Sequence, residues 1–237
     1  MFYVGGGSTL KYAQKMMAGL HVIINHLKQH FKLPKVRLLD VPCGDMQWMG
    51  HFLQNRDDIV YTGIDIVSDL IKHHRESYAN RPWTFYEMDI VADSTFVNNY
   101  DLIISRHMMQ HLDNAAVFSI LKKLSDDTQH PSFLLATTHS NTPTNIELNI
   151  HLPGRGRPLN LELAPFRLGP PLCMLADGDH HKRPHYAGLW RLPLMAIPKS
   201  FCSQSKPAIF FTQLSAKEFY SCVSWGLPNI TRILRLI

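Results

Sequence analysis

Short apolar segments rich in branched residues alternate with longer segments of helical periodicity in the chain up to Thr138. A short apolar run is typical of a buried strand, whereas apolar residues three or four apart indicate one face of a helix. The expected strands are 36–41, 59–66, 84–90, 100–106 and 132–138, and the expected helices are 10–31, 48–53, 68–78 and 113–124. Strands separated by helices pair in parallel through right-handed crossovers. The alternation therefore predicts an α/β fold with a doubly wound, Rossmann-like, mostly parallel sheet.

The composition of the chain changes after His139. Proline, glycine, arginine and histidine become frequent, as in PGRGRP at 153–158 and DGDHHKRPH at 177–185. Because ligands of such sheets bind beyond the carboxyl ends of the strands, we expect this region to be a loop-rich cap with short strands over that edge. The predicted single domain of 1–194 comprises an N-terminal helix (1–35), a core that carries the ligand-binding edge (36–140), and loops and short strands that cover this edge (141–194). Residues 195–237 are expected to be an extension. The periodicity of their apolar residues is too weak to predict helices or strands.

Charge and cysteine content exclude several other classes of protein. Positions 1–39 hold six basic side chains and no acidic one, and the remainder holds 18 basic against 19 acidic side chains. This is no basic stripe, so nucleic acid is not the expected partner. The four cysteines are irregularly spaced, which argues against disulfides and a zinc site. No apolar run reaches the about 20 residues that cross a bilayer, and the start does not resemble a secretory signal, so we expect a cytoplasmic protein of undetermined oligomeric state.

Three acidic residues stand where consecutive predicted strands end: Asp40, Asp65 and Asp89. The carboxyl ends of parallel strands meet at one edge of the sheet, so these carboxylates are expected to lie together. A carboxylate that ends the second strand can accept hydrogen bonds from both hydroxyls of a ribose. Acids at strand ends also cap helices, but three in succession favour a nucleoside-containing ligand.

Residues 38–50, LLDVPCGDMQWMG, resemble the first motif of class I S-adenosylmethionine-dependent methyltransferases. Pro42 and Met46 stand where that family commonly has glycine, and Gly44 is retained. A subset of the family, marked by D-V-P-C-G-D-x-x-W-M, is similar in further motifs. Here these are GGGST at 5–9, SRHMMQHL at 105–112, TTH at 137–139, LNLELAPF at 159–166 and GLW at 188–190. The subset often has aspartate where this chain has His107.

The resemblance implies that the chain binds S-adenosylmethionine and transfers its methyl group. It implies that the methionine portion contacts Asp40, Cys43, Gly44 and Asp45. The ribose would contact Asp65, with Ile66 beside it, and the adenine would contact Asp89 and Ile90. Ser105, Arg106 and His107 would lie near the sulfonium. A sulfonium methyl is already activated, so the protein mainly has to orient the acceptor.

A hydroxyl or ammonium acceptor also needs a base, and histidine titrates in the right range. The candidates are His107, His111 and His139, the first two being expected on one helical face. No metal is expected, because the adjacent histidines at 180 and 181 rarely converge on one ion. Polar side chains after the fifth strand suit a small-molecule or glycan acceptor; they are Asn145, Arg155, Arg157, Asn160 and Trp190.

Two alternatives remain open from the residues alone. The spacing of Asp40 and Asp65 also suits a nicotinamide-dependent oxidoreductase. The unusual residues Pro42, Met46 and His107 would also suit a catalytically silent module that binds the cofactor or a partner.

Overall fold

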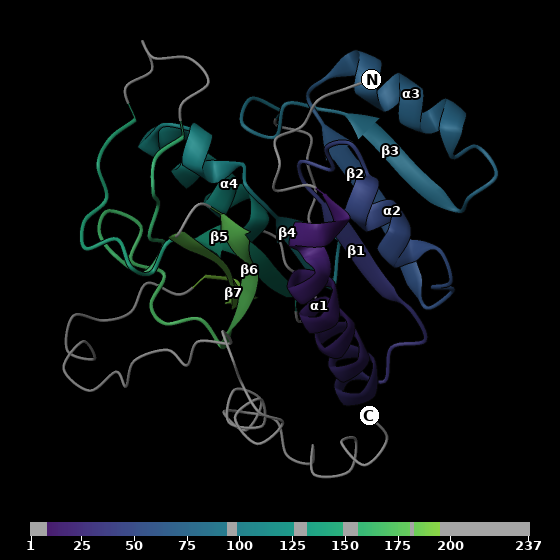
Figure 1. Ribbon diagram of the computed structural model, residues 1–237, viewed down its shortest axis with the longest axis horizontal. Helices are drawn as coiled ribbons and strands as arrows, with labels where there is room; N and C mark the ends of the chain where they lie inside the picture. The colour runs from purple at the N-terminus through teal and green to yellow at the C-terminus, as the bar shows by residue number, and fades with distance from the viewer. Residues whose placement is uncertain (1–8, 94–98, 126–131, 149–155, 181–182, 195–237) are drawn as a thin grey trace.

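The computed structural model describes residues 9–93, 99–125, 132–148, 156–180 and 183–194 (Figure 1). The helices are α1 (Leu10–Phe31), α2 (Gln47–Leu53), α3 (Ser68–Ser77) and α4 (Asn114–Ser125), with a 3-10 turn at Met109–His111. The strands are β1 (Val36–Asp40), β2 (Ile59–Asp65), β3 (Trp83–Glu87), β4 (Leu102–Ser105), β5 (Ser132–Thr138), β6 (Cys173–His180) and β7 (Arg183–Leu192). All the helices and strands expected before residue 139 are present, within a few residues of their predicted ends.

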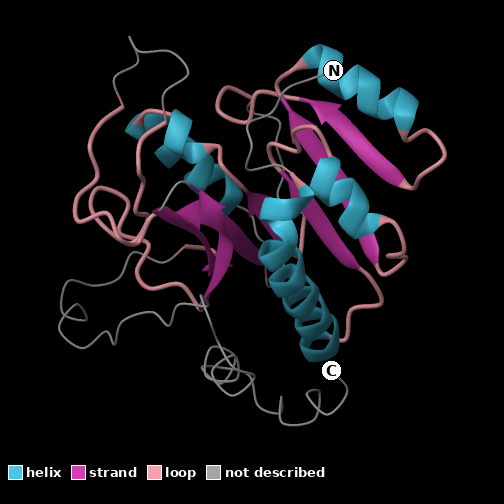
Figure 2. Ribbon diagram, viewed as in Figure 1, coloured by secondary structure: helices cyan, strands magenta, loops and turns pink. Residues whose placement is uncertain are grey.

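One sheet of seven strands in the order β3-β2-β1-β4-β5-β7-β6 runs through the molecule (Figure 2). The pairs from β3 to β5 are parallel, and β7 is antiparallel to both β5 and β6. The chain builds outward from β1 to β3, then returns to place β4 on the other side of β1. The strand order therefore reverses between β1 and β4, and the carboxyl ends of these two strands form the topological switch point, where such folds bind ligands. The predicted doubly wound α/β fold is confirmed.

Helices cover both faces of the sheet. On one face, α1 and α2 contribute Met16, Leu20 and Met49 to a core with Leu38 and Leu102 of the sheet. On the other face, α4 packs its buried residues, which are Val117, Ile120, Leu121 and Leu124, against the sheet. Every residue of β4 and β5 is buried. A strand covered on both faces needs a continuous apolar run, and this is why the sequence identified these strands.

The hairpin of β6 and β7 differs from the loops and short strands expected over the ligand edge. Its two strands of 8 and 10 residues extend the sheet, and β7 pairs with β5 from Ser132↔Leu192 to Thr138↔Tyr186. Polar and turn-forming residues at 177–185 hide the strand pattern in the sequence. Pairing with β5, which is distant in the sequence, stabilises these strands, and no local pattern reports such a partner. The loops between β5 and β6 are irregular as expected.

Candidate functional site

The turn after β1 is held in place by hydrogen bonds from two other elements. The Cys43 N–H donates to the Ile64 carbonyl (2.9 Å), and the Gly44 N–H donates to Asp65 Oδ2 (3.1 Å). His74 Nε2, on α3, lies 2.6 Å from the Gly44 oxygen, and because a carbonyl only accepts, the ring must donate. Both polar groups of the Gly44 backbone are therefore satisfied before any ligand arrives.

His74 is a member of the site that the sequence analysis missed. Its side chain is buried against Phe85, and burial lowers the pKa of its imidazole. The ring is therefore neutral near pH 7, with its proton on Nε2. Because α3 is recognised only as an amphipathic helix, nothing local in the sequence marks His74 as a partner of the turn at Gly44.

Two glycines allow the turn to lie close to the sheet. Gly44 has φ of +54°, in the left-handed region that a side chain disfavours. A Cβ at Gly63 would lie 3.0 Å from Cys43 Cβ and 3.0 Å from the Tyr61 oxygen. Strand β2 therefore passes directly under the turn because position 63 has no side chain.

Asp40 is almost fully buried at the end of β1. Burial raises the pKa of its carboxyl to about 7, although the Tyr61 hydroxyl donates to Oδ2 (3.1 Å) and the charge of Arg106 opposes the shift. Because burial makes the ionised carboxylate unfavourable, a cation bound next to Asp40 would stabilise it. Met46 lies on the other side of the same hydroxyl, with its sulfur 3.0 Å from the Tyr61 oxygen.

Asp65 stands at the end of β2 as predicted, 7% exposed. One carboxylate oxygen accepts from Gly44 N–H and the other from Val67 N–H (3.1 Å). Each carboxylate oxygen has two acceptor positions, so both can still accept from a hydroxyl. The next residue, Ile66, is 61% exposed, which makes an apolar surface beside the carboxylate.

Asp89 lies two residues beyond the end of β3 rather than within a strand to residue 90. Its Oδ1 accepts from the N–H groups of Val91 (2.9 Å) and Ala92 (3.3 Å), so it also caps a turn. Ile90 is buried in the core beside α4. Thus Asp89 is placed at the expected edge, while the Ile90 side chain packs inward.

Lys123 of α4 holds this same loop. Its Nζ donates to the carbonyls of Ile90 (3.1 Å), Val91 (2.6 Å) and Asp93 (2.5 Å). The sequence analysis assigned no role to Lys123. The three carbonyls are distant from Lys123 in the sequence, so these contacts depend on the packing of α4.

Three further predicted residues surround the turn. Cys43 is buried, and burial with the nearby charges of Asp40 and Asp65 raises the pKa of its thiol. Asp45 is partly buried, which raises its pKa, and its carboxylate accepts from the Gln47 backbone (3.2 Å) and side chain (2.9 Å). The Ser105 hydroxyl, at the end of β4, is buried and has no hydrogen-bond partner among the described groups.

A second group of side chains gathers where β4, β5, β6 and β7 meet the same edge. Arg106 follows β4, and its guanidinium lies 5.2 Å from the Trp48 ring and forms an ion pair with Asp177 of β6 (2.7 Å). The next residue, His107, places Nε2 3.3 Å from the other Asp177 oxygen. Asp177 has no exposed surface.

Strand register brings further histidines to this group. Because Thr138 pairs with Tyr186, His139 and His185 lie opposite each other, with ring centroids 5.0 Å apart. The His185 ring is 5.4 Å from that of His107. We call Asp177, His107, His139 and His185 the histidine cluster.

His111 is not part of the histidine cluster. The expected helical face shared with His107 does not form, because His107 has φ of +56° and only 109–111 make a 3-10 turn. His111 is exposed on its own segment, against Gly156. The structure therefore brings together two of the three predicted base candidates.

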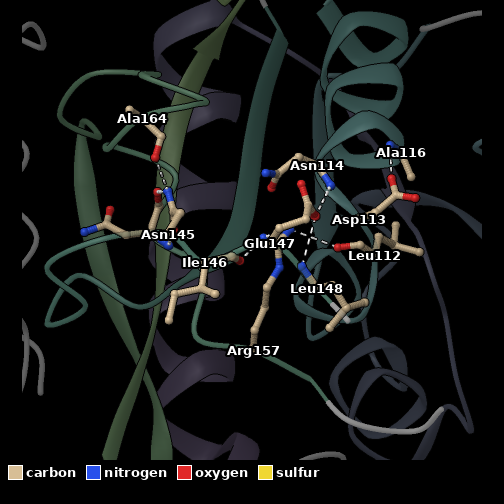
Figure 3. A network of polar contacts seen from close by, with 11 residues as sticks. Leu112, Asp113, Asn114, Ala116, Asn145, Ile146, Glu147, Leu148, Arg157 and Ala164 are labelled. Atoms are coloured by element: carbon tan, nitrogen blue, oxygen red, sulfur yellow. Dashed lines mark hydrogen bonds and ion pairs between the residues drawn. The ribbon is translucent and has the colours of Figure 1, made fainter. Parts of the chain in front are cut away.

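The polar residues expected to face an acceptor instead hold the loop after β5 (Figure 3). The Asn145 amide donates to the carbonyls of Asn160 and Ala164 (both 2.8 Å). Arg157 donates to the carbonyls of Ile146 and Leu112. Trp190 is buried, and its indole N–H donates to Gly169 (3.0 Å). Arg155, the GGGST motif up to residue 8, and 195–237 lie outside the described residues.

Glu147 completes this loop at the start of α4. Its Oε1 accepts from the Asn114 N–H (3.0 Å), while Asp113 accepts from the Ala116 N–H (2.7 Å) (Figure 3). Two carboxylates at a helix N-terminus interact favourably with the helix dipole. The loop is thereby tied to α4.

Within the described ranges, no group of three histidine, cysteine or acidic side chains could hold a metal ion. None of the helices in those ranges is long and apolar enough to cross a membrane.

Comparison with known proteins agrees with this geometry. Residues 38–127, from β1 through α4, match the family described as methyltransferase domain. The matched segment is less than half of the chain. The match includes the turn at Gly44, the end of β2 and the start of the histidine cluster. No curated protein sequence matches the chain.

Several solved structures are similar to this chain. Magnesium protoporphyrin IX methyltransferase (ChlM) from Synechocystis PCC 6803, with bound SAM, is 12% identical over 81% of this chain and 86% of its own, with a TM-score of 0.53. PH0226 from Pyrococcus horikoshii OT3 is 13% identical over 79% of this chain and 93% of its own, also at 0.53. The plantazolicin methyltransferase BpumL, in complex with SAH, is 20% identical over 52% of this chain and only 46% of its own, with a TM-score of 0.42.

The match agrees with the predicted methyltransferase, for which the resemblance in sequence implies S-adenosylmethionine as the methyl donor. The residues fit that donor. The buried Ser105 hydroxyl has no hydrogen-bond partner among the described groups. Gly44 has no side chain, so a ligand can lie against its backbone. Burial makes the ionised form of Asp40 unfavourable, and a cationic group of the ligand would stabilise it.

Proposed function

We propose that the methyltransferase domain acts on a hydroxyl or amine of a small-molecule or glycan acceptor. The observation that supports this most is the placement of the carboxylates and the histidine cluster on neighbouring strands at one edge. β1 and β4 are paired, so Asp40 and Ser105 end side by side at the switch point. Arg106 connects the two groups, contacting Trp48 on one side and Asp177 on the other.

The proposed donor site follows the strand ends. Asp65 accepts the ribose hydroxyls, with Ile66 as an apolar surface beside it, and Asp89 and the backbone of Ile90 border the adenine. Asp40, Cys43, Gly44 and Asp45 surround the amino acid portion, with Ser105 and Arg106 near the sulfonium. The cationic groups of the donor would offset the cost of ionising the buried Asp40.

When bound, S-adenosylmethionine supplies an activated methyl group. The protein's own part is to hold the acceptor in line and to accept its proton. The imidazoles of the histidine cluster lie on the strands next to the donor site, where a neutral ring can do so. The Arg106 guanidinium is paired with Asp177, so it offers little to a polyanion, which favours a small neutral or cationic acceptor over nucleic acid.

Titration calorimetry with S-adenosylmethionine and NAD tests the donor. We expect heat only with S-adenosylmethionine, and we expect Asp65→Ala to weaken binding at least tenfold, since a buried charged hydrogen-bond acceptor contributes about 1.5 to 3 kcal/mol. Asp57→Asn, a change to an exposed carboxylate before β2, is the control and should bind normally.

Transfer from S-[methyl-³H]adenosylmethionine to panels of phenols, amines, carboxylic acids and oligosaccharides tests the acceptor. Product with the wild type and none with Asp65→Ala supports the proposal. Tight donor binding without transfer to any panel member favours the silent binding module.

A further inference from the structure

Asp177 is fully buried, and the two side chains that its carboxylate faces, Arg106 and His107, lie about 70 positions earlier in the sequence. It ends the regular part of β6, at the same edge as the carboxyl ends of β4 and β5. Arg106 contacts both of its oxygens, with Nε at 2.8 Å from Oδ1 and 3.0 Å from Oδ2. The Oδ2 atom also faces His107 Nε2 at 3.3 Å. The carboxylate therefore has two cationic or potentially cationic neighbours.

A buried ion pair is seldom needed for stability alone. Removing two charges from water costs so much that an apolar pair of similar volume often does as well or better. A buried pair of this kind therefore points to a role other than stability. The third member, His107, suggests what Asp177 does there.

The backbone of His107 is held so that its ring faces Asp177. Its φ of +56° is sparsely populated by residues with a side chain, and such conformations persist where the surroundings impose them. The His107 N–H donates to Thr137 Oγ1 (3.0 Å), which ties this position to β5. Two strands therefore determine where the ring lies, in addition to Asp177.

Among the other predicted bases, His139 is already engaged. Its Nδ1 lies 3.1 Å from the Leu159 N–H and 3.3 Å from the Leu159 carbonyl oxygen, which already accepts from the His139 backbone N–H (2.8 Å). Because the Leu159 N–H can only donate, Nδ1 accepts and the proton of the neutral ring is on Nε2. Burial lowers the pKa of His139, which keeps it neutral. The unprotonated nitrogen of His139 already accepts a hydrogen bond, so this ring is a poor proton acceptor. The third candidate, His111, lies outside the histidine cluster.

We propose that Asp177 is a positioning residue that orients His107 and stabilises its protonated ring, which makes His107 the group that takes the acceptor's proton. The inference rests on the proposed function. The acceptor oxygen or nitrogen forms a bond to the methyl carbon as the methyl–sulfur bond breaks, and that electron pair stays on the sulfur, leaving a neutral thioether. The proton of the acceptor passes to a ring nitrogen of His107 and afterwards to water.

The charged and titratable groups that face His107 set the direction of the effect. They are Arg106 beside it, Asp177 on β6 and His185 on β7, with His139 behind His185. Asp177 is the anion among them and favours the imidazolium, whereas Arg106 competes for the same carboxylate. Opposite charges at this separation shift a pKa by about 1 to 3 units.

NMR titration of ring-labelled histidine tests the proposal without any acceptor. The His107 signal is assigned by its loss in His107→Gln. In Asp177→Asn we expect its titration midpoint to fall by about 1 to 3 pH units, and in Arg106→Gln we expect it to rise. His51, exposed on α2, is the internal control and should titrate alike in every variant.

An equal His107 midpoint in the wild type and Asp177→Asn would overturn the proposal. If Asp177→Asn fails to fold, the double variant Arg106→Gln with Asp177→Asn removes both buried charges and carries the test. A His107 midpoint in the double variant well below that of Arg106→Gln supports the proposal, and equal midpoints in these two variants overturn it. Absence of methyl transfer by the wild type would instead contradict the proposed function. The His107 titration midpoints do not depend on that result, so the two failures can be distinguished.

The acceptor found in the transfer assay provides a second readout. The acid limb of kcat/KM against pH should move with the His107 midpoint in Asp177→Asn. A limb that does not move although the midpoint does would show that His107 is not the base, and it would overturn the proposal.

Discussion

Replacing Asp40 with asparagine should make the ligand-free protein more stable while weakening its hold on the donor. The carboxyl is buried, and its pKa rises from 3.8 to about 7. Above pH 7 the folded protein must keep an anion where burial favours the neutral acid. Asparagine has the same shape, keeps an oxygen that can accept from Tyr61, and carries no charge.

The magnitude follows from the size of the pKa shift. A group with a raised folded pKa favours folding below its unfolded pKa, and that advantage is lost as the pH rises to the folded value. For Asp40 the window is 3.8 to about 7. At about 1.4 kcal/mol per unit, the carboxylate costs about 4 kcal/mol above this window. The variant should gain part of that, about 2 to 4 kcal/mol, with the gain growing across the window and then levelling.

Urea unfolding measured at several pH values from about 4 to 8, with Asp57→Asn as the exposed control, checks the stability. Calorimetry with S-adenosylmethionine should show about tenfold weaker binding, because one charged partner is lost. A variant less stable than the wild type above pH 7, or a stability difference that does not change with pH, would refute this reasoning.

Two further variants test the residues that hold the turn at Gly44 and the loop at 90–93, which border the proposed S-adenosylmethionine site. His74→Phe keeps the aromatic packing but removes the donor to the Gly44 carbonyl, so we expect about 1 to 3 kcal/mol less stability and about tenfold weaker binding of S-adenosylhomocysteine by calorimetry. In the wild type, the lowered His74 pKa means that its contribution is present above about pH 6.5 and is lost as the pH falls, which urea unfolding in the two proteins would show. Lys123→Met should lower the unfolding free energy by about 1 to 2 kcal/mol through loss of its bonds to the 90–93 carbonyls, whereas Lys72→Met, at an exposed position of α3, should not.

The positions of the carboxylates in the proposed donor site could be predicted from the sequence because the signals for them are local. Asp40 and Asp65 end their strands, and the position of a strand end follows from the length of the apolar run before it. Parallel pairing then places both at one edge whatever the packing details. His74 and Lys123 were missed because each acts on a loop that is distant from it in the chain.

The arrangement of the residues on the proposed acceptor side could be predicted only in part. His107 and His139 were named as base candidates, but the helix expected to pair His107 with His111 does not form, since a positive φ interrupts it. Asn145, Asn160, Arg157 and Trp190 were expected to face the acceptor, yet their polar side-chain groups donate to carbonyls of the loop backbone. A sequence shows that a residue is polar, and it does not show which backbone group will need that polarity.

By itself, then, the amino-acid sequence determined the order and type of the elements up to β5, the two-sided burial of the sheet, and the edge at which the carboxylates collect. Those properties arise from periodicity within short segments. The tertiary structure alone decided that β6 and β7 join the sheet, that Asp177 lies between Arg106 and His107, and that His185 faces His139. Such contacts join residues as many as 71 positions apart, and their energy appears only once the chain has brought them together.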